Sequence, residues 1–355
     1  MAQWSKEQAW AWYDAQPWLR GCNYLPADCC NRIALWQELD FEQHLATADR
    51  ELALAAAIGF NSIRVIVEFM VWDEEHDGFM ARLERFIATA AKHGISLMVC
   101  FANDCTVPRD ENYRPQQLGP QAYDWGYHGG RKNSPHRQLN AMGYYPALDE
   151  PATAKRFYAM VAEIVSTYAN DPRVVIWDIY NEPGAANRGD ASVPHVEGLF
   201  GVARDCSPSQ PLTTAVWRGL GRFSAAEQRA LALSDLVSFH NYSSLESNVV
   251  LIRELRKLGR PLLNSEWLHR QQRNTVQELF PLFFLEKIGC WNWGFVAGLS
   301  QTYEPWEGMW ERYQAGDQNI DFTKWQHDLF RPSLRPYDPR EIDLIKRLCK
   351  LSDQG

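Results

Sequence analysis

Two glutamates stand where a pair of carboxyl groups could carry acid–base and nucleophilic chemistry. Glu182 and Glu266 each follow a short apolar run, residues 174–180 and 261–264. A carboxyl group desolvated at the end of a buried run has a raised pKa, whereas one beside a cation such as Arg64 stays ionised. Two carboxyl groups with separated pKa values can supply a general acid and a nucleophile. The residues alone equally allow one glutamate to be a salt-bridge partner and the other to cap a loop.

The elements that must position these residues alternate along the chain. Short β-branched runs and longer amphipathic patterns follow each other, as in βαβ units around a parallel sheet. The predicted strands are 19–24, 62–67, 96–101, 174–180, 212–216, 236–239, 261–264 and 289–293. The predicted helices are 42–58, 79–93, 152–169, 193–204, 225–233, 246–258, 275–287 and 339–351. Gly59 and Gly94 directly follow two of these helices, where a residue with positive φ is expected.

Strict alternation of strands and helices predicts an α/β fold, a single (β/α)8 TIM barrel spanning residues 1–355, with an N-terminal helical extension at about 1–17. The competing open sheet would carry a glycine-rich first turn, which the segment 25–28 lacks. The third and eighth βα loops, 102–151 and 294–338, are long and lie on the face where barrel enzymes act. We expect about half of their aromatic residues to pack the loops and the rest to face a ligand. These are Tyr123, Trp125, Tyr127, Tyr144, Tyr145, Tyr303, Trp306, Trp310, Tyr313 and Trp325.

Composition excludes several classes of partner. The formal net charge is 36 − 44 = −8, so a cationic footprint for nucleic acid or an anionic membrane is absent. No run of 18 apolar residues exists to span a membrane. The 15 Trp, 14 Tyr and 16 Phe exceed what a core needs, which indicates an aromatic cleft.

The eight cysteines are expected to be reduced thiols in a cytoplasmic protein, because the N-terminus has no apolar signal region. Two alternatives stay open: a signal peptide removed from the chain, or a metal site formed by Cys29, Cys30 and a third residue. No CxxC pair supports the metal site. We therefore expect neither a cofactor nor a metal.

Barrel geometry narrows the search for site residues to polar and aromatic side chains near strand ends. The residues at these strand ends include Arg64, Asn103, Asn181, Glu182, His240, Tyr242, Glu266 and Trp293, and the motifs described next single out these eight as candidates. A metal-dependent hydrolase would need a cluster of histidines and carboxylates from several strands, and His240 alone among the histidines follows a predicted strand.

The motifs around these candidates resemble those of cellulase-like members of glycoside hydrolase clan A, similar to family five. Residues 177–183, Trp-Asp-Ile-Tyr-Asn-Glu-Pro, resemble the Asn-Glu-Pro signature that ends strand four in that clan. Residues 61–64 resemble its second-strand motif with an arginine, and 240–242 its His-x-Tyr after strand six. Trp293 matches a tryptophan that commonly ends strand eight. The resemblance covers roughly residues 21–348.

One position departs from the family pattern. Many members carry a histidine after strand three, where this chain has Asn103 and Asp104. Subfamily and substrate therefore stay open on that side of the site. His128 or His136 of the third loop could substitute, although both fit solvated loop histidines equally well.

The resemblance implies a retaining β-glycosidase that uses two glutamates. Glu266 would be the nucleophile and Glu182 the acid/base, while Arg64 and Tyr242 would support the nucleophile. Asn181 would bind the sugar 2-hydroxyl, and Asn103 is a further candidate for sugar binding.

Two more residues take roles from the resemblance. His240 would contact sugar hydroxyls or the carboxylates, and Trp293 would form an apolar floor under the sugar. The substrate would be an oligosaccharide or glycoside, and the oligomeric state is open. We expect exo-action or action on short oligosaccharides. The alternatives are an endo-acting cellulase-, mannanase- or xylanase-type enzyme, and a non-catalytic sugar-binding protein on a hydrolase scaffold.

Overall fold

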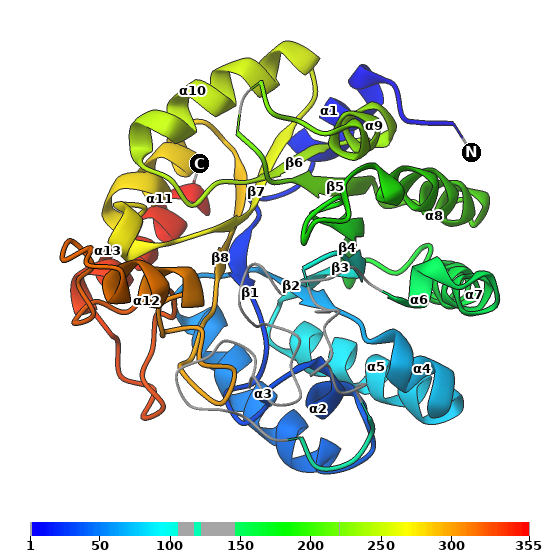
Figure 1. The fold of residues 1–355 in the computed structure, drawn as a ribbon, viewed down its shortest axis with the longest axis horizontal. Coiled ribbons are helices and arrows are strands. Elements are labelled where there is room, and N and C mark those ends of the chain that lie inside the picture. The colour runs from blue at the N-terminus through cyan, green and yellow to red at the C-terminus, as the bar shows by residue number, and fades with distance from the viewer. Residues whose placement is uncertain (1, 106–116, 122–145, 220, 355) are drawn as a thin grey trace.

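The computed structural model describes residues 2–105, 117–121, 146–219 and 221–354. Eight parallel strands close into a barrel in sequence order, with β1 pairing with β8 to complete the ring (Figure 1). The strands are β1 Arg20–Asn23, β2 Ser62–Ile66, β3 Ser96–Asn103, β4 Val174–Asn181, β5 Leu212–Val216, β6 Val237–His240, β7 Leu262–Trp267 and β8 Gly289–Trp293. The predicted (β/α)8 barrel is confirmed.

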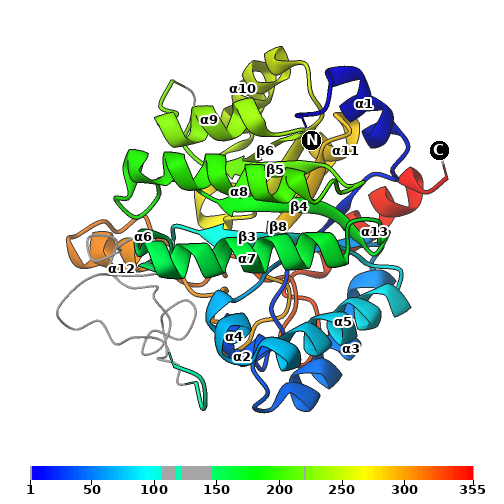
Figure 2. The same cartoon turned by 90° about the vertical axis from the view of Figure 1, so that its right-hand side faces the viewer.

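Helices surround the barrel on its outside (Figure 2). Those that the sequence predicted are α3 Phe41–Ala57, α5 His76–Lys92, α7 Pro151–Thr167, α8 Val193–Asp205, α9 Ala225–Leu233, α10 Leu245–Leu255, α11 Val276–Leu285 and α13 Pro339–Ser352. Gly59 and Gly94 follow two of them with φ of 96° and 70°, as expected for residues that end a helix. The predicted helix 246–258 ends as an α-helix at Leu255 and continues as the 3₁₀ turn Arg256–Leu258.

Four short helices interrupt the strict alternation that the sequence predicted. They are α2 Arg32–Trp36, α4 Phe69–Glu74, α6 Pro146–Asp149 and α12 Glu307–Gln314. The longest has 8 residues, which gives too few turns for an amphipathic period to stand out from loop sequence. Among the described residues, no helix is both long and apolar enough to span a bilayer.

Apolar side chains fill the amino-terminal end of the barrel. Helix α1, Lys6–Asp14, packs there through Ala9 and Tyr13, together with the preceding Trp4. The side chains from the strands, or from the residue just before a strand, in this cluster are Leu19, Met98, Val175, Ile176, Leu236, Leu263 and Trp291. The Tyr13 hydroxyl accepts from the backbone N–H of Gly289 (2.7 Å) and donates to the Lys287 carbonyl (2.9 Å). This end is therefore tied to α1 and sealed from solvent.

The long segment after β8 packs largely on itself. Trp310 stacks on Phe322 with ring centroids 4.1 Å apart, and Trp325 stacks on Tyr337 at 4.9 Å. Tyr303 lies against Trp325, and Tyr313 against Phe322. The third-loop aromatics Tyr123, Trp125, Tyr127, Tyr144 and Tyr145, and the histidines His128 and His136, lie outside the described residues.

Candidate active site

The carboxyl-terminal end of the barrel opens into a cavity of about 1250 Å³. The eight candidates predicted from the sequence all line it: Arg64, Asn103, Asn181, Glu182, His240, Tyr242, Glu266 and Trp293. They come together because parallel strands all end at this face.

Glu182 follows β4 in a left-handed backbone conformation, with φ of 49°. Such a conformation is uncommon for a residue with a side chain and persists where the surroundings enforce it. Buried Asp104 fixes the following turn: its Oδ2 accepts from the Gly184 N–H (2.7 Å) and from the Ser192 hydroxyl (2.5 Å). Burial raises the pKa of Asp104 to about 6. Asp104 therefore supports the loop that presents Glu182 and is not itself among the cavity-lining residues.

Glu266, near the end of β7, is held by a cation and a phenol. Nη1 of Arg64 lies 2.7 Å from Glu266 Oε1, and the Tyr242 hydroxyl donates to Oε2 at 2.8 Å. Arg64 is fully buried and also donates to Asp178 (2.8 Å) and to the side-chain oxygen of Asn181 (2.6 Å). This network orients Glu266 and places a fixed positive charge beside it.

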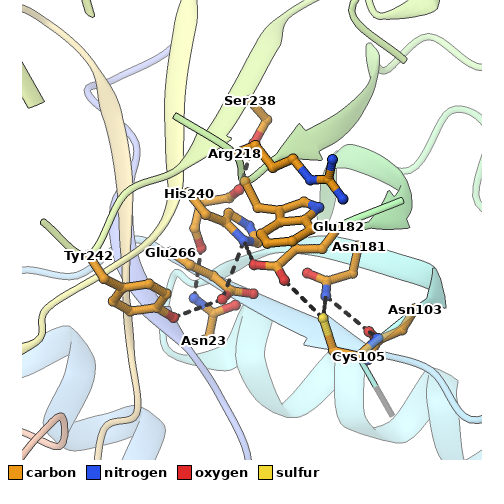
Figure 3. Close-up of polar contacts among 12 residues, drawn as sticks. Asn23, Asn103, Cys105, Asn181, Glu182, Arg218, Ser238, His240, Tyr242 and Glu266 are labelled. Atoms are coloured by element: carbon orange, nitrogen blue, oxygen red, sulfur yellow. Dashed lines mark hydrogen bonds and ion pairs between the residues drawn. The ribbon is translucent and has the colours of Figure 1, made fainter. Parts of the chain in front are cut away.

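The two glutamates meet across His240, as Figure 3 shows. His240 Nδ1 lies 2.6 Å from Glu182 Oε1 and 3.4 Å from Glu266 Oε2. One oxygen of each carboxyl group and a nitrogen of His240 all lie within 4.8 Å of one another. A single reacting centre can therefore contact both carboxyl groups.

Burial raises the pKa of both glutamates, but their neighbours differ. Burial also lowers the pKa of His240 to about 4, so this imidazole is neutral near pH 7. Arg64 and Tyr242 then remain to stabilise a charge on Glu266. Among the described residues, no arginine or lysine is in direct contact with Glu182 as Arg64 is with Glu266. The arrangement favours an ionised Glu266 beside a protonated Glu182.

Three residues of the network were missed at the sequence level. Asn23 ends β1 and accepts from Arg64 Nη1 at 2.7 Å, and Asp178 pairs with Arg64 inside the barrel. The charge of Asp178 within the apolar run 174–180 was a usable signal. Cys105 lies 2.9 Å from Glu182 Oε2, and nothing in its sequence context pointed to it.

The remaining candidates contribute amide and aromatic groups. Asn103 Oδ1 accepts from Asn181 Nδ2 at 3.0 Å, so it orients the neighbouring amide. Trp293 is partly exposed at the end of β8. Trp306 from the long eighth loop also lines the cavity and meets the Tyr242 ring edge-on, with centroids 5.1 Å apart. The other four predicted aromatics of that loop pair with rings of the loop itself.

Within the part of the chain that the structure describes, two groups of side chains have the composition of metal ligands. One is Glu182, His240 and Glu266. The other brings Asp28, Cys29 and His44 together, where the sequence alternative had paired Cys29 with Cys30. Asp28 in this group already accepts from the Thr47 hydroxyl at 2.9 Å and lies 3.1 Å from His44. All eight cysteines are free thiols.

A family model described as Cellulase (glycosyl hydrolase family 5) matches residues 38–293, which include β2 to β8. The chain belongs to glycosyl hydrolase family 5. This assignment confirms the resemblance of the strand-end motifs to clan A and makes the protein an O-glycosyl hydrolase. No curated protein matches the chain by sequence.

Solved structures with the same fold include other family 5 enzymes. The exo-β-1,4-mannosidase Op5Man5 from Opitutaceae bacterium strain TAV5 is 15% identical, with a TM-score of 0.58 over 95% of this chain. The chain spans 60% of that protein's length. GH5_18 from Streptomyces cattleya, solved in complex with GlcNAc, is 11% identical with a TM-score of 0.59, covering 95% of this chain and 80% of its own. A β-1,4-mannanase from the sea hare Aplysia kurodai is 13% identical with a TM-score of 0.54, covering 78% and 87%.

Proposed function

We propose that the protein is a retaining β-glycosidase in which Glu266 is the nucleophile and Glu182 the general acid/base. The observation that carries this proposal is the close approach of the two carboxyl groups, with one oxygen of each within 4.8 Å of the other. Retaining glycosidases hold their carboxyl groups about 5–5.5 Å apart, whereas inverting enzymes leave about 6.5–9.5 Å for a water molecule. The separation supports retention.

The reaction has two displacements. The Glu266 carboxylate attacks the anomeric carbon and forms an ester bond, while the bond to the leaving oxygen breaks and that oxygen takes the proton of Glu182. In the second step the Glu182 carboxylate accepts a proton from water, whose oxygen attacks the anomeric carbon and releases Glu266. Each glutamate returns to its starting protonation state.

The surrounding residues support these steps. Arg64 and Tyr242 fix the orientation of Glu266 and stabilise its charge before attack. Arg64 and Asn103 hold the Asn181 amide in place, from which it binds the sugar 2-hydroxyl. Trp293 offers an indole face on which the apolar side of a sugar ring packs.

The substrate in this proposal is a short β-linked oligosaccharide, cleaved from one end. The eighth loop supplies Trp306, Met309 and Arg312 to the cavity wall, which supports a site bounded on that side. The exo-β-1,4-mannosidase among the structural neighbours gives β-mannosides first place in a substrate panel. Endo-action is the second candidate, favoured by the likeness to the Aplysia mannanase.

A panel of aryl β-glycosides and short oligosaccharides, with NMR observation of the first-formed sugar, tests the proposal. We expect the β-anomer to appear first, and turnover to be lost in both Glu182→Gln and Glu266→Gln. Chelator should have no effect. Loss of activity with chelator would instead indicate that Glu182, His240 and Glu266 hold a metal, and sugar binding without turnover would indicate a non-catalytic protein.

A further inference from the structure

Cys105 places a thiol beside the proposed acid/base. It lies two residues after the end of β3, is partly exposed, and lines the cavity. Its Sγ lies 2.9 Å from Glu182 Oε2 and 3.7 Å from Nδ2 of Asn181 (Figure 3). The Cys105 backbone N–H donates to Asn103 Oδ1 at 2.8 Å, which fixes the backbone from which the thiol points to Glu182.

The thiol contacts the oxygen of Glu182 that His240 leaves free. His240 Nδ1 lies against Oε1, and the sulfur lies against Oε2. An acid/base residue must stay aligned both as a carboxyl group and as a carboxylate. A thiol can serve both states because its S–H donates to a carboxylate oxygen and, more weakly, to an oxygen of the neutral carboxyl group. Burial, reinforced by the Glu182 carboxylate, holds the pKa of the Cys105 thiol well above its usual range, so the sulfur keeps its proton.

We propose that Cys105 is a positioning residue for the glycosidase reaction, which aligns Oε2 of Glu182 in both half-reactions. Its S–H donates to Oε2 strongly when Glu182 is the carboxylate base and weakly when Glu182 is the acid, whose own proton points to the leaving oxygen. The proton on sulfur is never transferred, no bond to sulfur forms or breaks, and no oxidant takes part. The inference rests on the proposed function, because it assigns Glu182 the acid/base role.

The contact has a consequence that simple packing would not have. A hydrogen bond to the carboxylate lowers the pKa of Glu182 against the effect of burial. Removing the thiol should therefore raise that pKa, and the basic limb of the pH–rate profile should move up by roughly half a pH unit. The kcat for substrates with poor leaving groups should fall by about tenfold, since these need the acid most.

The first experiment compares pH profiles of kcat/KM for the wild type, Cys105→Ala and Cys105→Ser. The alanine variant should show the raised basic limb, and serine, which keeps a donor, should return it to the wild-type position or below. Cys206→Ala is the matched control: Cys206 is also a partly exposed thiol, but among the described residues its sulfur donates only to the backbone oxygens of Ala162 and Val202. An unchanged basic limb in Cys105→Ala would overturn the proposal.

A second readout does not depend on hydrolysis. Iodoacetamide labelling followed by mass spectrometry gives the alkylation rate at Cys105. At a pH above the basic limb of the wild type, where Glu182 is ionised, Glu182→Gln removes the adjacent negative charge and should speed labelling of Cys105 by about threefold or more, while Cys206 keeps its rate. If Glu182→Gln leaves the alkylation rate at Cys105 unchanged, the proposed contact is wrong, even if the wild-type enzyme cleaves glycosides. If the rate rises but the wild type cleaves no glycoside, the contact is supported and the proposed function is overturned.

Discussion

The amino-terminal end of the barrel is filled by apolar side chains, whereas the carboxyl-terminal end opens into a cavity whose floor carries charged and amide side chains. At the first, Trp4, Tyr13 and Trp291 are buried in one cluster. At the second, Arg64 and Asp178 are completely buried as an ion pair. Apolar burial stabilises a fold directly, whereas a buried ion pair contributes little net stability because its charges lose their hydration. The contrast indicates that one end of the barrel maintains the fold and the other is organised for chemistry.

The largest effect on this difference between the two ends is expected when the nucleophile is neutralised. Glu266→Gln should lower kcat/KM by about 1000-fold or more, because the amide cannot form the glycosyl-enzyme. Its melting temperature should hardly change, because the Gln amide oxygen can still accept from Arg64, which keeps its buried ion pair with Asp178. Steady-state kinetics and thermal unfolding on the same preparation measure both effects. A large fall in melting temperature would mean that the carboxyl-terminal network maintains the fold after all.

The reciprocal change is Trp4→Ala at the sealed end. Trp4 is 6% exposed, and its removal should lower the free energy of unfolding by about 3 kcal/mol, through lost burial and the cavity left behind. The kcat of the folded protein at low temperature should stay at the wild-type value. Denaturant unfolding and kinetics below the transition give the two quantities. Trp10→Ala, at a position 42% exposed on the adjoining helix α1, is the control and should change little.

Two tyrosines, one at each end of the barrel, allow a finer comparison of the two ends, because substitution with Phe removes a single hydroxyl group from each. Tyr242→Phe removes the donor that lowers the pKa of Glu266, so that pKa should rise. Activity is lost as the pH falls through the pKa of the nucleophile, so the acidic limb should move to higher pH. The kcat/KM at the optimum should fall by about tenfold, as expected for a lost hydrogen bond to a charged group. An acidic limb that stays in place would exclude Tyr242 as the partner of the ionised nucleophile.

The smallest effect is expected for Tyr13→Phe at the sealed end. The Tyr13 hydroxyl bridges Lys287 and Gly289 through their backbone groups, and its loss leaves a buried N–H unpaired. We expect the free energy of unfolding to fall by about 1–2 kcal/mol. Both limbs of the pH–rate profile should coincide with those of the wild type. A shifted limb would show that the two ends are coupled through β8.

The fold and the two glutamates could be predicted because short stretches of sequence reveal the alternation of strands and helices, and the polar residues that end each strand. Glu182 and Glu266 each close an apolar run, and Gly59 and Gly94 mark helix ends by their own conformational freedom. Most strand boundaries were close to those observed, whereas β7 continues to Trp267, beyond the predicted end at 264, because polar residues interrupt its apolar run.

The roles of Cys105 and Asp104 could not be predicted from the sequence, because they depend on contacts between distant segments. Cys105 meets Glu182 across 77 positions, and the role of Asp104 in supporting the next loop depends on Ser192, 88 positions away. A short polar segment such as 103–105 has no periodicity to show which of its side chains points into the cavity. Helix α12 was missed because its few turns lie within a long aromatic loop.

Azide rescue tests most directly the claim that the two glutamates have different roles. With an activated aryl β-glycoside, Glu266→Ala should regain turnover in azide and release a glycosyl azide of inverted configuration, because azide occupies the place of the nucleophile. Glu182→Ala should release a glycosyl azide of retained configuration, because azide then attacks the glycosyl-enzyme. An inverted azide from Glu182→Ala would exchange the two roles, and no rescue of either variant would contradict the two-glutamate account.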